Sequence, residues 1–209
     1  MSARIGYADD GKGTVMRGVV AGLIVVLAAG GLAHAQVGQQ LVVTMHLAGP
    51  VKPAGGAYYI AFTADDALLT GPQSDSSNWS HYVLYRGGRF FFGRIPPGAF
   101  RPFEFVAVRP PQPYIFGQVL AGGRGLRVRV ALSDLQTGPT VPRRVKVNFV
   151  TVDDRLTPLD ALGEGAGDRF AFLTVDLRRD TYVAGEDRSG DASDPSFDIT
   201  GGDVQVTVP

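Results

Sequence analysis

Short runs in which apolar and polar residues alternate make up most of the chain after residue 40. The clearest run is 125–131, where Leu126, Val128 and Val130 alternate with Arg127 and Arg129. Alternation with a period of two is typical of β-strands that bury one face, and clusters of Gly, Pro, Asn and Asp between the runs indicate turns. Strands are therefore predicted over residues 41–47, 57–63, 81–85, 89–93, 103–108, 114–120, 125–131, 143–152, 170–176 and 203–208.

This pattern predicts an all-β fold. Residues 132–135 are expected to form one helical turn, and no long stretch with a helical period follows residue 40. The sequence Arg-Gly-Gly at 86–88 predicts a hairpin between two of the strands. About nine or ten short strands with Gly- and Pro-rich turns are typical of a single antiparallel β-sandwich, with a β-barrel as the alternative.

An uncharged apolar run precedes the strands. Residues 18–32 follow Arg17 and lead to Ala33-His34-Ala35, which satisfies the small-x-small rule for signal peptidase. The run is shorter than the roughly 20 residues that span a bilayer and contains several glycines. A cleaved signal peptide is therefore favoured over a transmembrane anchor.

The expected domain organisation follows from this cleavage site. Residues 1–35 are predicted to be a signal peptide with an extended n-region, or one that truly starts at Met16, and residues 36–209 are predicted to be one β-sandwich domain. The product is expected to be secreted or extracytoplasmic, in a periplasm or on a cell surface. No stable transmembrane anchor is expected after cleavage.

Composition narrows the chemistry of the mature chain. There is no cysteine, which excludes disulfides and a lipid-modified cysteine at the cleavage site. Residues 1–35 hold three basic and two acidic residues, so 17 of 20 basic and 18 of 20 acidic residues are left. A nearly neutral domain disfavours nucleic-acid binding, because phosphate contacts require a basic surplus. The expected partner is an extracellular glycan or an envelope component, and a homo-oligomer stays open.

Several short motifs suggest a family. A strand over 58–62 runs into the acidic turn 64–66 and the Thr-Gly-Pro step 70–72 before the next strand, and a late strand with a single helical turn occupies 126–135. In these features the chain resembles the DOMON-like sandwiches, a superfamily that includes certain carbohydrate-binding modules and extracytoplasmic haem domains. Where that pattern has an Asp-x-Asp turn, this chain has Ala-Asp-Asp. The resemblance implies an extracytoplasmic sandwich that binds carbohydrate.

Aromatic residues are frequent in or beside the predicted strands. Amphipathic rings exposed on a sheet can stack on the apolar faces of sugars, and the same rings can fill a core. Tyr58 and Tyr59 are neighbours on one strand, so one of them must face outward or towards another layer. The candidate ligand-binding residues are Tyr59, Trp79, Tyr82 and Tyr114, with core packing as the alternative.

Carboxylates are densest in the segment 186–198. Calcium takes six to eight oxygen ligands, which a flexible acidic loop can supply. Asp187, Asp191 and Asp194 are therefore candidate calcium ligands. The spacing does not match the twelve-residue calcium loop, and Arg188 lies among the acids, so solvated loop charge is the alternative that the sequence favours.

Enzymatic and haem functions find little support in the sequence. A Ser/His/Asp site would need His46 or His81, and no nucleophile-elbow, zinc-protease or phosphate-loop motif is present. Haem, which one branch of the resembling superfamily implies, would need axial ligands such as Met45 with His46 or His81. Because alternation places Met45 on an apolar strand face, haem is disfavoured. No cofactor is expected, with a calcium ion as the alternative that stays open.

The sequence thus favours a secreted, non-catalytic β-sandwich that binds an extracellular carbohydrate or envelope ligand. The alternative is a structural or assembly protein of the cell envelope, in which the tail 36–40 or the terminal strand 203–208 adds to a neighbour's sheet. A carbohydrate-active hydrolase, whose two carboxylates can lie far apart in sequence, is the least favoured.

Overall fold

The described part of the chain is a β-sandwich. The computed structural model describes residues 39–96, 103–163 and 171–208, all within the compact unit Gln36–Pro209. They form two antiparallel sheets that do not close into a barrel, which confirms the predicted fold class. No helix among these residues is both long and apolar enough to cross a membrane. The signal peptide predicted over 1–35 lies outside the described residues.

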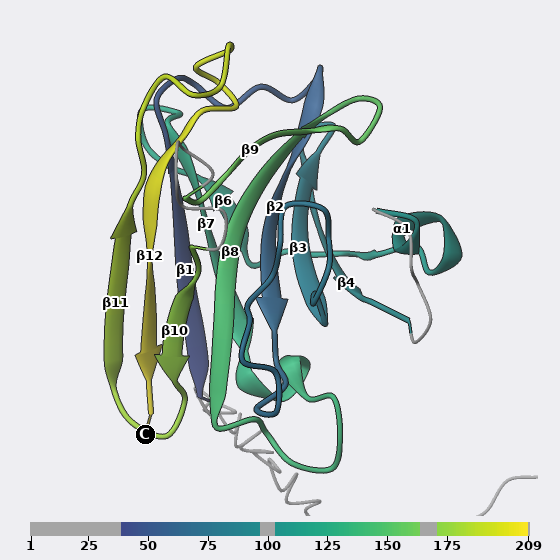
Figure 1. Cartoon of the computed structure of the whole chain (residues 1–209), viewed down its shortest axis with the longest axis vertical. Helices are drawn as coiled ribbons and strands as arrows, with labels where there is room; N and C mark the ends of the chain where they lie inside the picture. Colours follow the sequence, from purple (N-terminus) through teal and green to yellow (C-terminus); the bar gives the residue numbers. More distant parts are fainter. Residues whose placement is uncertain (1–38, 97–102, 164–170, 209) are drawn as a thin grey trace, which may run out of the picture. The chain divides into compact units, whose positions relative to one another are not determined.

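The first sheet has five strands in the order β11-β12-β1-β7-β6 (Figure 1). They are β1 (Gln40–Leu47), β6 (Gly117–Val119), β7 (Gly125–Ala131), β11 (Thr181–Glu186) and β12 (Ile199–Thr207). Gln40 pairs with both neighbours of β1, and β12 pairs with β1 and with β11. The expectation that the terminal strand 203–208 offers a free edge is therefore wrong, because each of its edges already has a partner.

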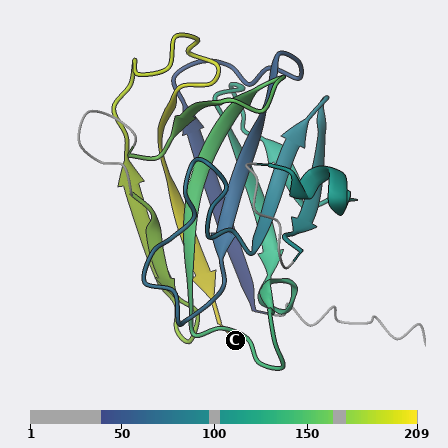
Figure 2. The same ribbon diagram turned by 45° about the vertical axis from the view of Figure 1, so that its right-hand side comes forward.

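The second sheet has seven strands in the order β10-β8-β2-β3-β4-β5, with β9 also paired to β8 (Figure 2). They are β2 (Gly56–Thr63), β3 (His81–Arg86), β4 (Arg89–Arg94), β5 (Gln112–Pro113), β8 (Arg144–Asp153), β9 (Pro158–Ala161) and β10 (Leu173–Asp176). The predicted hairpin joins β3 to β4. Its central residues Gly87 and Gly88 have φ angles of 61° and 76°, which a two-residue type I′ turn requires and glycine adopts without strain.

Several predicted elements differ from the observed ones. The described residues hold twelve strands, because β5, β9 and β11 were not predicted. The strand predicted over 114–120 is reduced to β6. The segment 103–108 forms the short helix α1 (Phe105–Val108) instead of a strand. A turn at Phe103, whose φ is 56°, and the helical turn after it place two buried phenylalanine rings in one cluster, so packing overrides the strand pattern. The helical turn Leu132–Leu135 is confirmed as a 3-10 helix.

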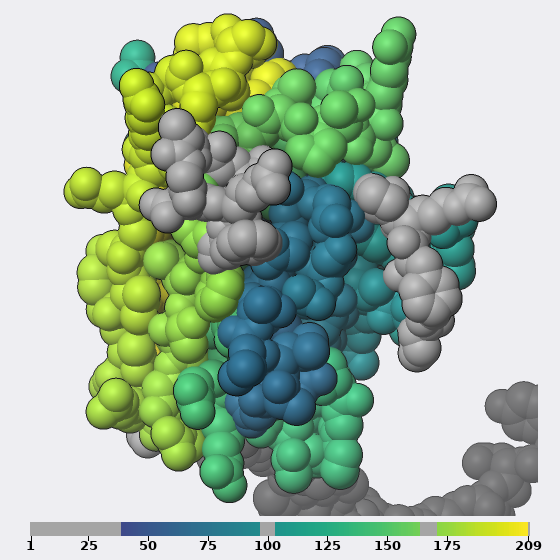
Figure 3. Space-filling view, viewed as in Figure 1, coloured from purple at the N-terminus to yellow at the C-terminus, as the bar shows by residue number. Residues whose placement is uncertain are grey.

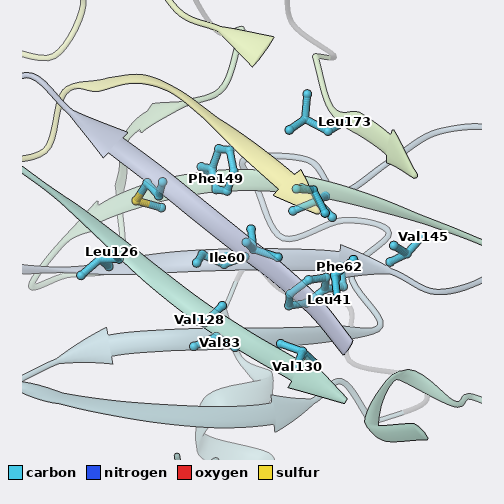
Figure 4. Close-up of a cluster of buried hydrophobic side chains, with 14 of the residues drawn as sticks. Leu41, Ile60, Phe62, Val83, Leu126, Val128, Val130, Val145, Phe149 and Leu173 are labelled. Atoms are coloured by element: carbon cyan, nitrogen blue, oxygen red, sulfur yellow. The ribbon is translucent and has the colours of Figure 1, made fainter. Parts of the chain in front are cut away.

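The main core fills the space between the two sheets. Alternate residues of each long strand point into it, as the period-two pattern predicts. The inward side chains include Leu41, Val43, Met45, Tyr58, Ile60, Phe62, Leu126, Val128, Val130, Val145, Val147 and Phe149. Figure 4 shows part of this cluster, with Leu41, Ile60 and Phe149 among the labelled side chains. Burying each of the larger apolar side chains contributes about 1.5–3 kcal/mol, so this cluster is the main source of stability in a chain without disulfides.

A second core covers the outer face of the seven-stranded sheet. It joins Tyr59, Trp79, Tyr82, Leu84 and Val150 with the rings of Phe103, which precedes helix α1, and of Phe105, which begins it. As a result, β2 is buried at all eight positions. The covering layer is the segment 64–80 together with α1; Figure 3 shows the blue atoms of residues before β3 lying over this side of the molecule.

Hydrogen bonds attach the segment 64–80 to the sheet beneath it. Lys146 Nζ donates to the carbonyl oxygen of Leu68 at 2.5 Å, and Asn148 Nδ2 donates to that of Pro72 at 2.8 Å. Both donors lie on β8 and are buried. A buried polar group without a partner is costly, so these two contacts fix the position of the layer.

Replacing Trp79 tests the second core. Trp79→Ala should lower the free energy of unfolding by about 3–5 kcal/mol, because a large buried ring is lost and a cavity is left. Urea unfolding of the purified protein measures this change. The matched control is Tyr182→Ala, whose ring is 67% exposed on β11 and whose loss should change stability by less than about 0.5 kcal/mol. Equal stabilities of the two variants would contradict the assignment of Trp79 to a core.

Candidate functional site

Three of the four candidate aromatic residues are core residues. Tyr59, Trp79 and Tyr82 are 1%, 5% and 0% exposed. The Tyr59 ring lies 5.4 Å from that of Trp79 and 5.8 Å from that of Tyr82, and Trp79 Nε1 donates to the carbonyl oxygen of Gln73 at 2.7 Å. Their faces therefore pack against one another instead of forming the exposed platform that ligand stacking needs. This corrects the expectation for these three residues.

The outer face of the five-stranded sheet is open by comparison. Its outward residues on β7, Arg127 and Arg129, are exposed, as are Tyr182 and Glu186 on β11 and Gln205 on β12. On the seven-stranded sheet, the corresponding outward positions of β2 and β3 are buried under the second core. The open face is therefore where side chains of several strands can meet a ligand.

Strand register aligns the side chains of this face in rows. Residues directly opposite one another in antiparallel strands point to the same side of the sheet. One row reads Tyr182, Gln205, Val42 and Arg129, and Phe116 extends it because Arg129 N donates to its carbonyl oxygen. With about 4.8 Å between strands, the five positions span about 19 Å.

The next row carries more hydrogen-bonding groups. It reads Ala184, Asp203, Thr44, Arg127 and Gln118 from β11 to β6. Arg127 Nε donates to Thr44 Oγ1 at 3.2 Å, and His46 Nε2 lies 3.3 Å from Asp203 Oδ2. The face thus places a polar row beside a row with an aromatic ring at each end.

A hollow of about 430 Å³ lies at the β6 and β7 side of this face. Phe116 and Ile115 at its rim are 53% and 83% exposed. A smaller hollow of about 160 Å³ adjoins it, and Phe116 and Arg129 line both. The lining of the larger hollow is Val42, Ile115, Phe116, Gly117, Gln118, Arg127 and Arg129. Apolar side chains and a few convergent polar groups are typical of ligand sites.

Two arginines line the larger hollow, and the acidic residue Asp134 lines the smaller one. Among the residues that the structure describes, neither Arg127 nor Arg129 forms an ion pair within 4.0 Å. Guanidinium groups bind carboxylates and similar anions through two parallel hydrogen bonds. Two of them without an acidic partner at one hollow can therefore receive an anionic group.

Tyr114, the fourth candidate aromatic residue, lies beside this hollow and contacts two of its lining residues. Its hydroxyl donates to the carbonyl oxygen of Arg129. Its ring lies 5.6 Å from that of Phe116 in an edge-to-face arrangement and 5.6 Å from that of Phe92. Burial raises the pKa of Tyr114 above its usual range, so the hydroxyl stays protonated and keeps donating. Tyr114 thus positions two residues that line the hollow.

The three predicted calcium ligands are not gathered in one place. Asp194 pairs with Lys52 Nζ at 2.6 Å, and the Lys52 ammonium lowers the pKa of this carboxyl. Asp187 Oδ2 accepts a hydrogen bond from the backbone N–H of Gly163 at 3.0 Å. Only Asp191 belongs to a cluster with metal-ligand spacing, together with Asp160 and Asp198; one carboxylate oxygen from each lies within 4.8 Å of the others.

Two members of this acidic cluster are buried. Asp160 on β9 is 4% exposed and accepts hydrogen bonds from the backbone N–H groups of Ala161 and Ile199 at 2.8 and 2.5 Å. Asp198 is 2% exposed; its Oδ2 accepts a bond from Gly190 N at 2.8 Å, and its Oδ1 has no hydrogen-bond partner among the described residues.

Burial and mutual repulsion act on the same cluster. Burial raises the pKa of Asp160 to about 8, and the carboxylates of Asp191 and Asp187 add to this increase, against the opposing effect of the Ile199 N–H. Burial also raises the pKa of Asp191, and its proximity to Asp198 adds to this shift. The arrangement is unfavourable for three ionised carboxylates without a counter-charge.

The two histidines occupy different environments. His46 is exposed on the open face, and its neighbour Met45 is buried in the main core on the opposite face of β1, so the strand does not direct the pair to one haem iron. His81 is 1% exposed and stacks on Phe92 at 5.9 Å. Its Nδ1 lies 3.0 Å from Ser80 Oγ, which itself donates to the carbonyl oxygen of Phe62, so Nδ1 carries the proton and donates to Ser80.

Comparisons with family models, with curated proteins and with solved structures found no match to this chain. The resemblance to DOMON-like sandwiches therefore stays a prediction.

Sequence reasoning missed three of the residues that the structure brings forward. Phe116 was one of several apolar residues in a predicted strand over 114–120, and nothing local shows that its ring is exposed. Tyr182 lies on β11, which was not predicted. The sequence offers one signal for Asp160: it is a single acid between the apolar residues Leu159 and Ala161.

Because His81 is buried, we expect the protein to lose stability in acid. Burial lowers the pKa of His81 to about 4 from its usual value of 6.5, and the positive charges of Arg94 and Arg109 add to this shift. The folded state then binds fewer protons than the unfolded state between these two pH values. The stabilisation of the folded state by the neutral His81 side chain is fully present above pH 6.5. It declines to zero as the pH falls through 4, which lowers the free energy of unfolding by about 3 kcal/mol.

Urea unfolding at pH 7 and at pH 4 measures this loss. His81→Gln should lose about 3 kcal/mol less than the wild type between the two pH values, because its side chain does not titrate. Gln205→Ala, which replaces an exposed uncharged side chain on β12, is the control and should follow the wild type. The same loss in all three proteins would contradict the role of His81.

Proposed function

We propose that this chain is an exported, non-catalytic binding module for an extracellular carbohydrate that carries acidic groups. The ligand would lie on the open face of the five-stranded sheet. The observation that carries the proposal is the hollow at β6 and β7. There, Arg127 and Arg129 form no ion pair with any acidic residue that the structure describes, and they lie beside the exposed ring of Phe116.

The arginines favour an anionic ligand. Each guanidinium offers donors in a planar fork that matches a carboxylate, and a charge-assisted bond of this kind is worth about 1.5–3 kcal/mol. Arg127 is held by Thr44 through its Nε, so its orientation on the face is already fixed. A uronate or another acidic sugar would supply the matching charge.

The remaining side chains favour a sugar over a small inorganic anion. Phe116 offers an apolar ring on which a pyranose face can stack, and Gln118 offers both a donor and an acceptor for hydroxyl groups. Gln205 and the ring of Tyr182 extend the first row across the sheet for about 19 Å. This length suits an extended ligand of several sugar units.

Binding is proposed instead of hydrolysis because of what lines the hollow. Cleavage of a glycosidic bond requires two carboxylic acids placed on either side of the bond. Among the described residues, the lining of the larger hollow includes two arginines and a glutamine but no Asp or Glu, and Asp134 is the single acid that lines the smaller hollow. The expected signal peptide over 1–35 would bring the module to polysaccharides outside the cytoplasm.

A glycan array with the purified protein tests this function. We expect binding to uronate-containing polysaccharides and weaker binding to neutral ones, with affinity that falls as salt screens the arginines. Arg129→Ala should weaken the binding by about tenfold to a hundredfold, which corresponds to the loss of one charge-assisted contact. Calorimetric titration with the best ligand of the array gives these affinities.

The matched control is Arg155→Ala, an exposed arginine on the turn between β8 and β9 of the other sheet. It should bind like the wild type. The absence of binding to every glycan would contradict the carbohydrate ligand, and equal binding by both arginine variants would contradict the proposed face.

A further inference from the structure

We infer that the acidic cluster of Asp160, Asp191 and Asp198 binds a calcium ion. The inference is independent of the proposed function, because the cluster lies outside the hollow on the open face. Its members come from β9 and from the segment between β11 and β12. Figures 1 and 2 show β9 and this yellow segment at the same end of the sandwich.

The spacing of the carboxylates fits one ion. One oxygen from each residue lies within 4.8 Å of the other two. Calcium binds oxygen at about 2.3–2.6 Å, so three oxygens at this spacing can all reach a single ion. Magnesium requires shorter bonds of about 2.0–2.1 Å and regular octahedral geometry, which three carboxylates from two chain segments satisfy less well.

A second observation points to a ligand independently of the charge. Asp198 is 2% exposed, and its Oδ1 has no hydrogen-bond partner among the described residues. Its Oδ2 is fixed by the backbone N–H of Gly190 at 2.8 Å. A buried carboxylate oxygen without a donor costs free energy, and a cation in direct contact removes that cost.

The backbone holds the other buried carboxylate in place. Ala161 N and Ile199 N donate to the two oxygens of Asp160, so its position is set before any ion arrives. Asp191 is exposed and completes the cluster from the solvent side. Preorganised ligands of this kind, with one accessible position, leave a route for the ion and for the waters that complete its coordination.

The ion would join the two sheets at one end of the sandwich. Asp160 belongs to β9, which pairs with β8 of the seven-stranded sheet, whereas Asp198 directly precedes β12 of the five-stranded sheet. Near the cluster, Phe197 stacks on Tyr58 at 5.1 Å and its carbonyl oxygen accepts a hydrogen bond from Thr151 Oγ1 at 2.7 Å. Calcium would reinforce a contact between sheets that these groups already make.

Titration of the protein with calcium tests the inference. The purified full chain is stripped with a chelator and titrated with calcium chloride in a calorimeter. We expect one ion per chain with a Kd of about 10⁻³ M or tighter, and a higher melting temperature in calcium than in chelator. Magnesium should bind more weakly.

Two variants in the same segment locate the site. Asp191→Asn, which changes an exposed side chain, should weaken calcium binding by about tenfold or more, because a charged ligand becomes a neutral one. Asp194→Asn is the matched control: its carboxylate pairs with Lys52 outside the cluster and should leave calcium affinity unchanged. Asp198→Asn should abolish binding, and if this variant does not fold, Asp191→Asn decides alone.

The inference is overturned by either of two results. One is the absence of binding heat up to about 10 mM calcium together with equal melting temperatures in calcium and chelator. The other is calcium binding that Asp191→Asn and Asp194→Asn leave equally unchanged. Because the readout is calcium binding, failure here is distinct from failure of glycan binding.

Discussion

The structure depends on the need to cover both faces of β2. Every residue from Ala57 to Phe62 is apolar or aromatic, so this strand has no face that can meet water. The five-stranded sheet covers one face, and the segment 64–80 with α1 covers the other. This extra layer covers only the seven-stranded sheet. The outward residues of the other sheet are left exposed at most positions, and the proposed ligand site lies among them.

The sequence predicts well which strand positions face the main core between the two sheets. Alternation identifies the strands that face the main core, and Arg127 and Arg129 were correctly expected to point outward. The sequence predicts poorly which residues on the outer faces of the sheets are buried, because their burial depends on segments distant in the chain. Trp79 lies in a polar stretch and yet is 5% exposed, since the stretch folds back over β2. No local pattern shows that a polar segment will become the cover of a second core.

The same limit applies to the candidate sites. The acidic segment 186–198 is visible in the sequence, but Asp160, its partner from β9, lies about thirty residues earlier and meets it only through the pairing of β9 with β8. Likewise, the open face combines residues of five strands whose order, β11-β12-β1-β7-β6, cannot be read from their positions in the chain. At both sites the sequence shows which residue types are present, but it does not show which residues become neighbours in space.

The alternation on β7 has an evolutionary consequence. Leu126, Val128 and Val130 hold the core, while Arg127 and Arg129 between them touch only the open face. Stability and the proposed recognition are therefore encoded by interleaved residues of one strand. Single substitutions at the outward positions can change the chemistry of the open face while the packing stays intact. Such a scaffold can diverge in specificity one residue at a time, without a compensating change elsewhere in the fold.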